Sequence, residues 1–210
     1  MKTKERAKKI IQILKKEYPK ARTALRYKNA YQLIAATILS AQCTDVRVNA
    51  VTPKLFKKYP NIKALAKART NELERIIHST GFFKSKAKRL KGMAQTVIRE
   101  FNGKIPNTME GLVKLPGVGR KTANVVLHAA FGKSQGIVVD THVIRVSNKL
   151  GLTKNKNPEK IEEDLMKLFK KKDWKIISTA LILHGRKICI ARKPKCEICK
   201  LNKICPSSRV

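Results

Sequence analysis

The sequence predicts an all-α protein, and three observations support that fold class. Apolar residues recur at helical spacing along most of the 210-residue chain. The single strand-like run, residues 136–139, is short and isolated. No internal repeat or low-complexity linker separates the helical runs. The length is sufficient for a substantial core, in one large domain or in two small ones.

The helical runs follow one another closely along the chain. The first is amphipathic, with Ile10, Leu14 and Tyr18 at helical spacing. Residues 29–39 are apolar on most sides, which predicts a buried central helix. The remaining helices are expected at residues 45–59, 61–68, 70–78 with Thr70 as the N-cap, 85–101, 107–114, 123–131, 140–150, 158–171 and 174–187.

The chain is strongly basic along its whole length. It has 48 Lys and Arg residues against 14 Asp and Glu, a formal net charge of +34. Such an excess attracts polyanions, and nucleic acid is the commonest large one. No apolar run approaches the length of a transmembrane helix, and the N-terminus is too charged for a signal peptide. We therefore expect a cytoplasmic protein whose thiols stay reduced.

A glycine-rich turn at residues 115–119, Leu-Pro-Gly-Val-Gly, separates two of the expected helices. Gly117 and Gly119 allow the backbone to adopt positive φ and to come close to a ligand. The helix that follows presents unpaired N–H groups and a partial positive charge, which together suit a phosphate. Lys121 would lie in its first turn, so a reactive amine would stand beside a backbone-held phosphate. The unit is a helix–hairpin–helix.

The spacing excludes two other phosphate-binding loops. A P-loop needs four residues between its first Gly and its Gly-Lys-Ser/Thr, whereas only one residue separates Gly117 from Gly119. A dinucleotide-binding turn needs a third Gly where this chain has Thr122. Taken alone, the turn is also compatible with an ordinary connection between helices.

Four of the five cysteines, Cys189, Cys196, Cys199 and Cys205, lie close to the C-terminus. Because cytosolic thiols stay reduced, this group indicates a metal site rather than disulfides. Zinc and a [4Fe–4S] cluster both accept four thiolates. The spacing C-x6-C-x2-C-x5-C contains only one C-x2-C knuckle, which favours the cluster and leaves zinc as the alternative. The fifth cysteine, Cys43, is expected to be a small buried residue.

Asp140 stands directly before an apolar helical run, the position of a helix N-cap. By itself it would only cap that helix, and Lys121 by itself would only bind phosphate. The hairpin, the lysine, the aspartate and the four-cysteine segment occur in one chain, however, and together they point to a shared function.

This combination resembles the endonuclease III family of DNA glycosylases with AP-lyase activity. The resemblance implies two helical domains flanking a DNA-binding cleft. A six-helix domain would comprise residues 23–132, with the hairpin at about 115–119, and an iron–sulfur domain would join residues 1–22 to 133–210. The segments that carry the resemblance occur in family order and are residues 39–45 (LSAQCTD), 81–87 (GFFKSKA), 115–124 (LPGVGRKTAN), 139–146 (VDTHVIRV) and 184–205 with the four cysteines.

The resemblance also implies the chemistry. Lys121 would attack the sugar C1′ and form a Schiff base, and Asp140 would stabilise positive charge on the sugar and assist proton transfer. After base flipping, Gln42 would fill the vacated space and Phe82 would wedge into the stack, with Phe83 as the other candidate for the wedge. The four cysteines would hold a [4Fe–4S] cluster. Further DNA-binding residues are expected at Lys86, Gly117, Gly119, Arg120, Arg192, Lys193 and Lys195.

The expected partner is double-stranded DNA with a damaged base or an abasic site, bound by a monomer associated with the nucleoid and not with a membrane. The expected activity is removal of oxidised pyrimidines followed by β-elimination. An adenine-excising, monofunctional relative would lack the lysine at position 121 and carry an extra C-terminal domain. A non-catalytic hairpin module, or a zinc-stabilised nucleic-acid binder, would hold DNA without cutting it.

Overall fold

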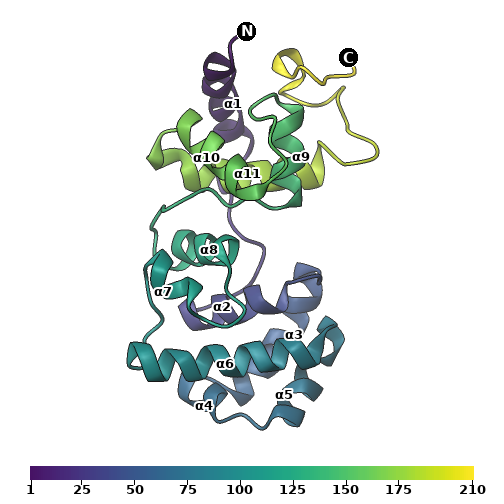
Figure 1. Ribbon diagram of the computed structural model, residues 1–210. Helices are drawn as coiled ribbons and strands as arrows, with labels where there is room; N and C mark the ends of the chain where they lie inside the picture. The colour runs from purple at the N-terminus through teal and green to yellow at the C-terminus, as the bar shows by residue number, and fades with distance from the viewer. The chain divides into compact units, whose positions relative to one another are not determined.

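The computed structural model describes all 210 residues and confirms the all-α prediction (Figure 1). It contains eleven α-helices, three short 3-10 helices and no strand. The chain forms two compact units, residues 1–22 with 134–210 and residues 23–133. The second boundary thus lies one residue beyond the position expected from the sequence.

The continuous unit is built around α2, in which seven of ten residues are buried. Helices α3, α6 and α8 pack against it. The unit has seven α-helices, and two of them, α4 and α7, are only five residues long. Its elements are α2 (Ala30–Leu39), α3 (Asp45–Lys58), α4 (Ile62–Ala66), α5 (Thr70–Ile77), η1 (His78–Thr80), α6 (Phe83–Phe101), α7 (Met109–Val113) and α8 (Arg120–Ala130).

Side-chain caps set the start of several of these helices. Asn29 accepts a hydrogen bond from the backbone N–H of Gln32 at 3.0 Å, and Asn61 caps α4 in the same way. The prediction that Thr70 caps α5 is wrong. That helix begins at Thr70, its N-cap position is Arg69, and no side chain caps it.

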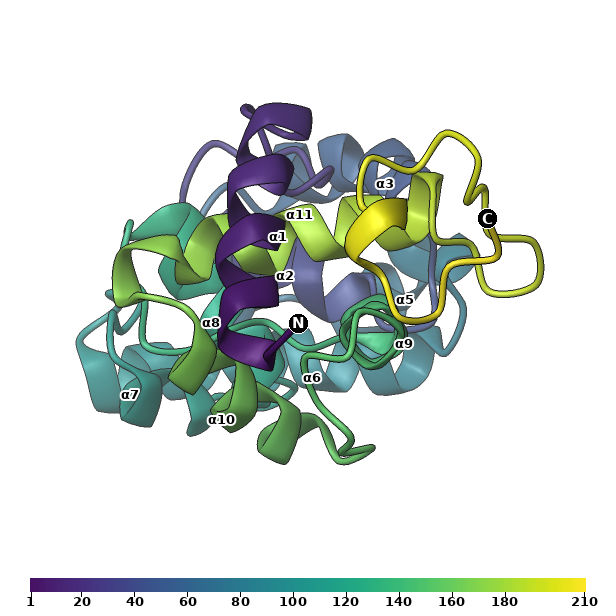
Figure 2. The same cartoon turned by 90° about the horizontal axis from the view of Figure 1, so that it is seen from above.

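The discontinuous unit brings the N-terminal helix together with the C-terminal third of the chain. Helix α11 packs against both α1 and α9, and α1 runs across α11 in the view of Figure 2. Ile10, Leu14 and Leu181 are among its fully buried residues. Its elements are α1 (Thr3–Glu17), α9 (Thr141–Lys149), α10 (Pro158–Leu168), η2 (Lys171–Asp173), α11 (Trp174–Lys187) and η3 (Asn202–Ile204).

The strand-like run at residues 136–139 is buried but forms no strand. Side chains satisfy its backbone instead. Glu162 accepts from the N–H of Ile137 at 3.2 Å, and Ser178 accepts from the N–H of Val138 at 2.9 Å. These bonds fix the approach to α9, and therefore the position of Asp140 at its start.

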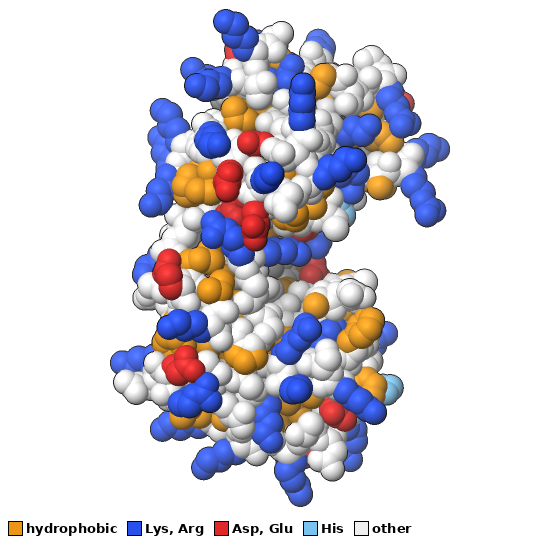
Figure 3. Space-filling model, in the orientation of Figure 1, with side chains coloured by type: hydrophobic (Ala, Val, Ile, Leu, Met, Phe, Trp, Pro, Cys, Tyr) orange, Lys and Arg blue, Asp and Glu red, His pale blue; other side chains and the backbone are white.

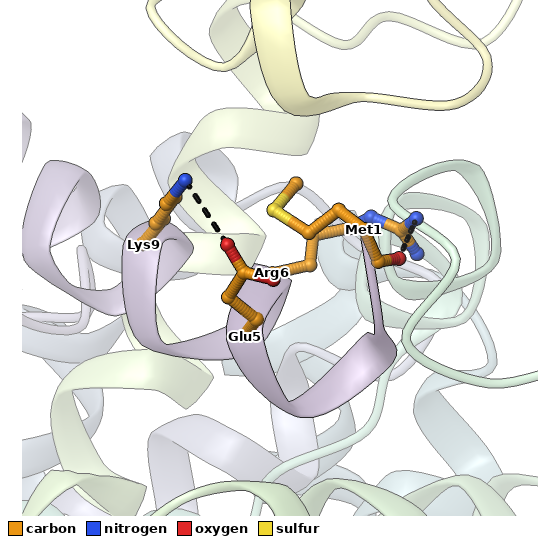
Figure 4. Close-up of polar contacts among 4 residues, drawn as sticks. All are labelled: Met1, Glu5, Arg6 and Lys9. Atoms are coloured by element: carbon orange, nitrogen blue, oxygen red, sulfur yellow. Dashed lines mark hydrogen bonds and ion pairs between the residues drawn. The ribbon is translucent and has the colours of Figure 1, made fainter.

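Lysine and arginine side chains cover much of the surface seen in Figure 3. Ion pairs neutralise some of them, such as Glu5–Lys9 at 3.3 Å, drawn in Figure 4 beside the bond from Arg6 to the Met1 carbonyl. Exposed pairs of this kind contribute little to stability. None of the helices is long and apolar enough to cross a membrane.

Candidate functional site

The hairpin joins α7 to α8 through a turn anchored by two buried apolar side chains, Leu115 and Val118. The N–H of Val118 donates to the Leu115 carbonyl at 3.0 Å and closes the turn. Gly117 has φ of +83°, and a Cβ there would lie 3.1 Å from the Cβ of Arg89. Glycine is therefore needed at position 117 for both its conformation and its size.

Gly119 has a different role from the one expected. Its φ is −88° and its ψ is 176°, an extended conformation open to any residue. It occupies the N-cap position of α8, where it supplies no side-chain cap, and a Cβ there would meet open space. No side chain caps this terminus, and an uncapped helix N-terminus suits an external anion.

Arg120 and Lys121 are the first two residues of α8 and both are exposed. They project from the first turn of the helix whose N-terminus has no side-chain cap. The sequence placed Lys121 correctly in the first turn of a helix that directly follows the hairpin. This arrangement can hold a phosphate with the backbone while offering a primary amine to a neighbouring sugar.

Asp140 is the N-cap of α9 and is half-buried in the other unit. Its Oδ1 accepts hydrogen bonds from the backbone N–H groups of His142 and Val143, each at 2.9 Å. Both bonds go to one oxygen, so Oδ2 is the carboxylate oxygen left to meet a substrate. Lys121 and Asp140 thus come from different units, each fixed by its own helix N-terminus.

Helix α9 is also tied to the segment that carries the cysteines. Arg145 donates to the carbonyl of Gly185, at the end of α11, and to that of Cys189, both at 2.8 Å. Gly185 permits the close approach of the two helices, since a Cβ there would lie 2.9 Å from the Cβ of His142. The imidazole of His142 is partly desolvated, and this burial lowers its pKa.

The four C-terminal cysteines line one cavity of about 60 Å³, together with Arg145, Lys149 and His184. All four thiols are free, and burial raises the pKa of Cys189, Cys199 and Cys205. Four thiols around one cavity form a ligand set that a [4Fe–4S] cluster or zinc accepts.

His184 contacts this cysteine site, and Tyr18 contacts His184 on the side away from the thiol. The Nε2 of His184 lies 3.6 Å from the Sγ of Cys199, and its Nδ1 lies 3.2 Å from the Tyr18 hydroxyl. Burial lowers the pKa of His184 to about 4, so the ring is neutral at physiological pH. Because Tyr18 belongs to the N-terminal segment, the sequence alone gave no reason to link it to the cysteines.

The loop between Cys189 and Cys196 presents three exposed cations, Arg192, Lys193 and Lys195. A bond from the Lys195 N–H to the Ile188 carbonyl at 3.0 Å closes the base of this loop. The side chains point to solvent from a short, anchored segment, as expected for residues that contact phosphates.

Gln42 and Phe82 are both exposed, and both have left-handed backbones, with φ of 52° and 47°. Such values are uncommon outside glycine. The Phe82 side chain is 66% exposed, whereas the ring of Phe83 is half-buried and lies 4.4 Å from the ring of His78, centroid to centroid. Of the two rings, Phe82 is therefore the exposed one, and it is not a core residue.

Lys86 requires a correction, because its ammonium does not face solvent. The residue is 2% exposed, and its Nζ donates to the Thr80 carbonyl at 2.7 Å. Burial lowers its pKa. A direct contact with DNA is therefore the wrong role for it. The sequence held a signal of this, since Lys86 shares a helical stripe with buried Leu90 and Met93.

Comparisons with known proteins agree with this arrangement. The family model for HhH-GPD superfamily base excision DNA repair proteins matches residues 35–171, and the model for the iron–sulfur binding domain of endonuclease III matches residues 189–205. Endonuclease III of Synechocystis sp. is 54% identical over 206 residues, which are 98% of this chain and 94% of that protein.

Two solved structures match almost the whole chain at a TM-score of 0.93 and 39% identity. They are a non-covalent endonuclease III–DNA complex and a trapped endonuclease III–DNA covalent intermediate. Each match covers 99% of this chain, and 97% and 98% of the respective structures. Neither a monofunctional glycosylase nor a non-catalytic module is favoured by these matches. The chain therefore belongs to the endonuclease III family of base excision DNA repair proteins, and it is a DNA glycosylase and AP lyase that carries an iron–sulfur cluster.

Proposed function

We propose that this enzyme flips an oxidised pyrimidine out of duplex DNA, removes it through Lys121 and then cuts the strand by β-elimination. The observation that carries the proposal is the position of Lys121, exposed in the first turn of α8 behind an uncapped N-terminus. The unpaired N–H groups there bind a DNA phosphate, which holds the adjacent sugar within reach of the amine.

The lysine chemistry proceeds through a Schiff base. The neutral amine of Lys121 attacks C1′ of the damaged nucleotide, the glycosidic bond breaks, and the base leaves with the bonding electrons and takes up a proton. Ring opening gives an imine between C1′ and Nζ. Loss of a proton from C2′ then expels the 3′ phosphate, and hydrolysis of the imine releases the product and restores the amine.

Asp140 acts on the sugar while the glycosidic bond breaks. Two backbone N–H groups hold its Oδ1, so the carboxylate keeps one orientation without rearranging during the reaction. Its Oδ2 stabilises the positive charge that develops on the sugar and accepts a proton in later steps.

The DNA is held by groups from both units. The hairpin at residues 115–119, with Arg120, binds the strand that carries the damaged nucleotide. Arg192, Lys193 and Lys195 bind phosphates at the cysteine loop. Phe82 enters the base stack and Gln42 faces the orphan base, which stabilises the flipped state. The enzyme works as a monomer in the cytoplasm, at the nucleoid.

Cys189, Cys196, Cys199 and Cys205 hold the cluster, which we assign as [4Fe–4S]. When bound, the cluster supplies four Fe–S bonds that fold the last segment of the chain onto α9 and α11. The chain contributes the arginine bonds from α9 and the neutral His184 ring beside Cys199. The role is structural, since it orients the basic loop toward DNA.

Borohydride trapping on a duplex with one abasic site tests the central step. Reduction of the imine should leave a covalent enzyme–DNA adduct, and Lys121→Gln should abolish it. The matched control is Lys114→Gln, which removes another exposed lysine just before the hairpin and should trap normally. An adduct that persists in cluster-loaded Lys121→Gln protein would show that Lys121 is not the nucleophile. Base release without any adduct from the unmodified enzyme would indicate a monofunctional glycosylase.

A further inference from the structure

Lys86 lies directly beneath the segment that carries Phe82 and holds it at both ends. Its side-chain Nζ donates to the Thr80 carbonyl at 2.7 Å, and its backbone N–H donates to the Phe82 carbonyl at 3.0 Å. Thr80 is itself buried, and its hydroxyl donates to the Ile77 carbonyl at 2.8 Å. The start of α6 and the end of η1 are thus fastened together through one residue.

The segment between these two bonds has an unusual backbone. Gly81 has φ of 69° and ψ of 159°, a region essentially restricted to glycine. Phe82 follows with φ of 47° and ψ of 31°, in the left-handed region. Such conformations persist only where the surroundings fix them. The consequence here is that Phe82 turns outward while Phe83 packs on His78.

The same ammonium also lies within electrostatic range of the second exposed loop. Cys43, the residue after Gln42, is close enough for a thiolate there to raise the pKa of Lys86, against the larger lowering by burial. Helix α3, which begins just after this loop, packs against η1. The loop that carries Gln42 and the turn that carries Phe82 are therefore neighbours of one buried charge.

Core stability does not account for a lysine at this position. A buried charge must be desolvated, and an apolar side chain of similar size usually fills such a site at lower cost. The neighbours of Lys86 on the buried stripe of α6, Leu90 and Met93, are apolar and fully buried. Of Lys86, Leu90 and Met93, only Lys86 can donate a hydrogen bond to a backbone carbonyl.

We infer that Lys86 is a positioning residue for base flipping: its buried ammonium holds the Thr80 carbonyl so that Phe82, and with it Gln42, stays in the conformation that enters the duplex. The inference rests on the proposed insertion of these two side chains. It predicts that loss of Lys86 slows the reaction on duplex DNA, where a base must be unstacked, and does not slow it where the sugar is already accessible.

The test compares two substrates in the cluster-loaded enzyme. Lys86→Met fills the same space without a donor. It should lower the single-turnover rate of thymine glycol excision from duplex DNA about tenfold or more, because the turn no longer holds Phe82 in the conformation needed for insertion. Cleavage of single-stranded DNA with a preformed abasic site should stay within about twofold, because no base is flipped. Lys88→Met, the same change at an exposed position of α6, should leave both rates unchanged.

A double-mutant cycle shows whether Lys86 acts through Phe82. If it does, Lys86→Met should have little further effect on duplex excision in a Phe82→Ala background. If the rate losses of Lys86→Met and Phe82→Ala multiply fully in the double variant, the inference is overturned. An equal rate loss on duplex and single-stranded substrates would also overturn it, because it would indicate a merely structural role.

Gly81→Ala provides a second variant if Lys86→Met fails to fold. A Cβ at position 81 meets open space, so only the backbone conformation is challenged. The same selective loss on duplex DNA is expected, and normal duplex excision by Gly81→Ala would overturn the inference. Failure of the proposed chemistry would appear separately, as the absence of a borohydride adduct from the unmodified enzyme.

Discussion

The N-termini of α8 and α9 differ in one respect that separates their functions. Helix α8 begins after Gly119 with no side-chain cap, whereas α9 begins after Asp140, whose carboxylate accepts two backbone N–H groups. An open terminus keeps its donors and its partial positive charge for an external anion. A closed terminus uses its donors to hold a carboxylate still. We therefore propose that the same structural element binds DNA in one unit and orients a catalytic group in the other.

The largest effect is expected from Asp140→Asn, which keeps the cap and removes the charge. Asparagine is as good an N-cap as aspartate, so the melting temperature should barely change. Glycosylase activity should fall about 10²- to 10⁴-fold, the range for loss of a positioned acid–base group. Single-turnover excision kinetics measure the effect. Near-normal excision by a folded variant would mean that Asp140 only caps α9.

Gly117→Ala should disturb the open terminus through the hairpin. Alanine at position 117 would have to adopt a φ of +83°, which is strained for a residue with a Cβ. That Cβ would also lie 3.1 Å from the Cβ of Arg89. We expect a loss of about 1–3 kcal/mol in the free energy of unfolding, measured by denaturant titration. The matched control is Gly119→Ala, at an unstrained φ with open space, which should lose only about 0.5 kcal/mol because alanine is a poorer N-cap than glycine. Equal effects at the two positions would contradict the distinction between them.

Gly119→Asp would close the open terminus and so make α8 resemble α9. The conformation is compatible and the space is free. The new cap should stabilise the protein by about 0.5–1 kcal/mol, close to the effect of a typical N-cap. DNA affinity should nevertheless fall about tenfold or more, because the cap occupies the phosphate-binding donors and adds a negative charge. Fluorescence anisotropy with an abasic-site duplex measures the affinity. Unchanged binding would show that α8 does not hold a phosphate.

The smallest effect is expected on the free energy of unfolding, when the side-chain cap of α9 is removed without a further change in charge. Asp140→Ala should lower the free energy of unfolding by about 1 kcal/mol relative to Asp140→Asn, because two N–H groups lose their acceptor. Both variants lack the carboxylate, so their excision rates should be similarly low. Denaturation of the two variants side by side gives the difference directly. Equal stability would mean that the bonds from His142 and Val143 do not contribute measurably.

Several features of the site followed from local patterns in the sequence. The hairpin was predicted from its glycines, the start of α9 from an aspartate before an apolar run, and the metal site from four closely spaced cysteines. Each of these patterns depends on residues near one another in the chain. Local chemistry decides such features, which is why the fold class and the positions of Lys121 and Asp140 within their helices could be predicted.

Other features depended on residues distant in sequence. Thr70 does not cap α5, and Gly119 does not need the positive φ expected of it. Lysine is usually a surface residue, yet Lys86 faces the core because it lies on the buried side of α6. Residue type alone does not reveal this orientation. The helical stripe shared with Leu90 and Met93 indicates it, and the elements packed around the helix decide it.

By itself the sequence determined the helices, the basic character, the uncapped hairpin helix with its lysine and the thiols for a cluster. Only the tertiary structure decided that Phe82 and not Phe83 is exposed, that Lys86 is buried against Thr80, and that Tyr18 and His184 stand behind Cys199. The physical reason is that burial and left-handed backbone conformations are imposed by long-range packing. The residues adjacent in the chain do not determine which distant residues will pack against a given side chain.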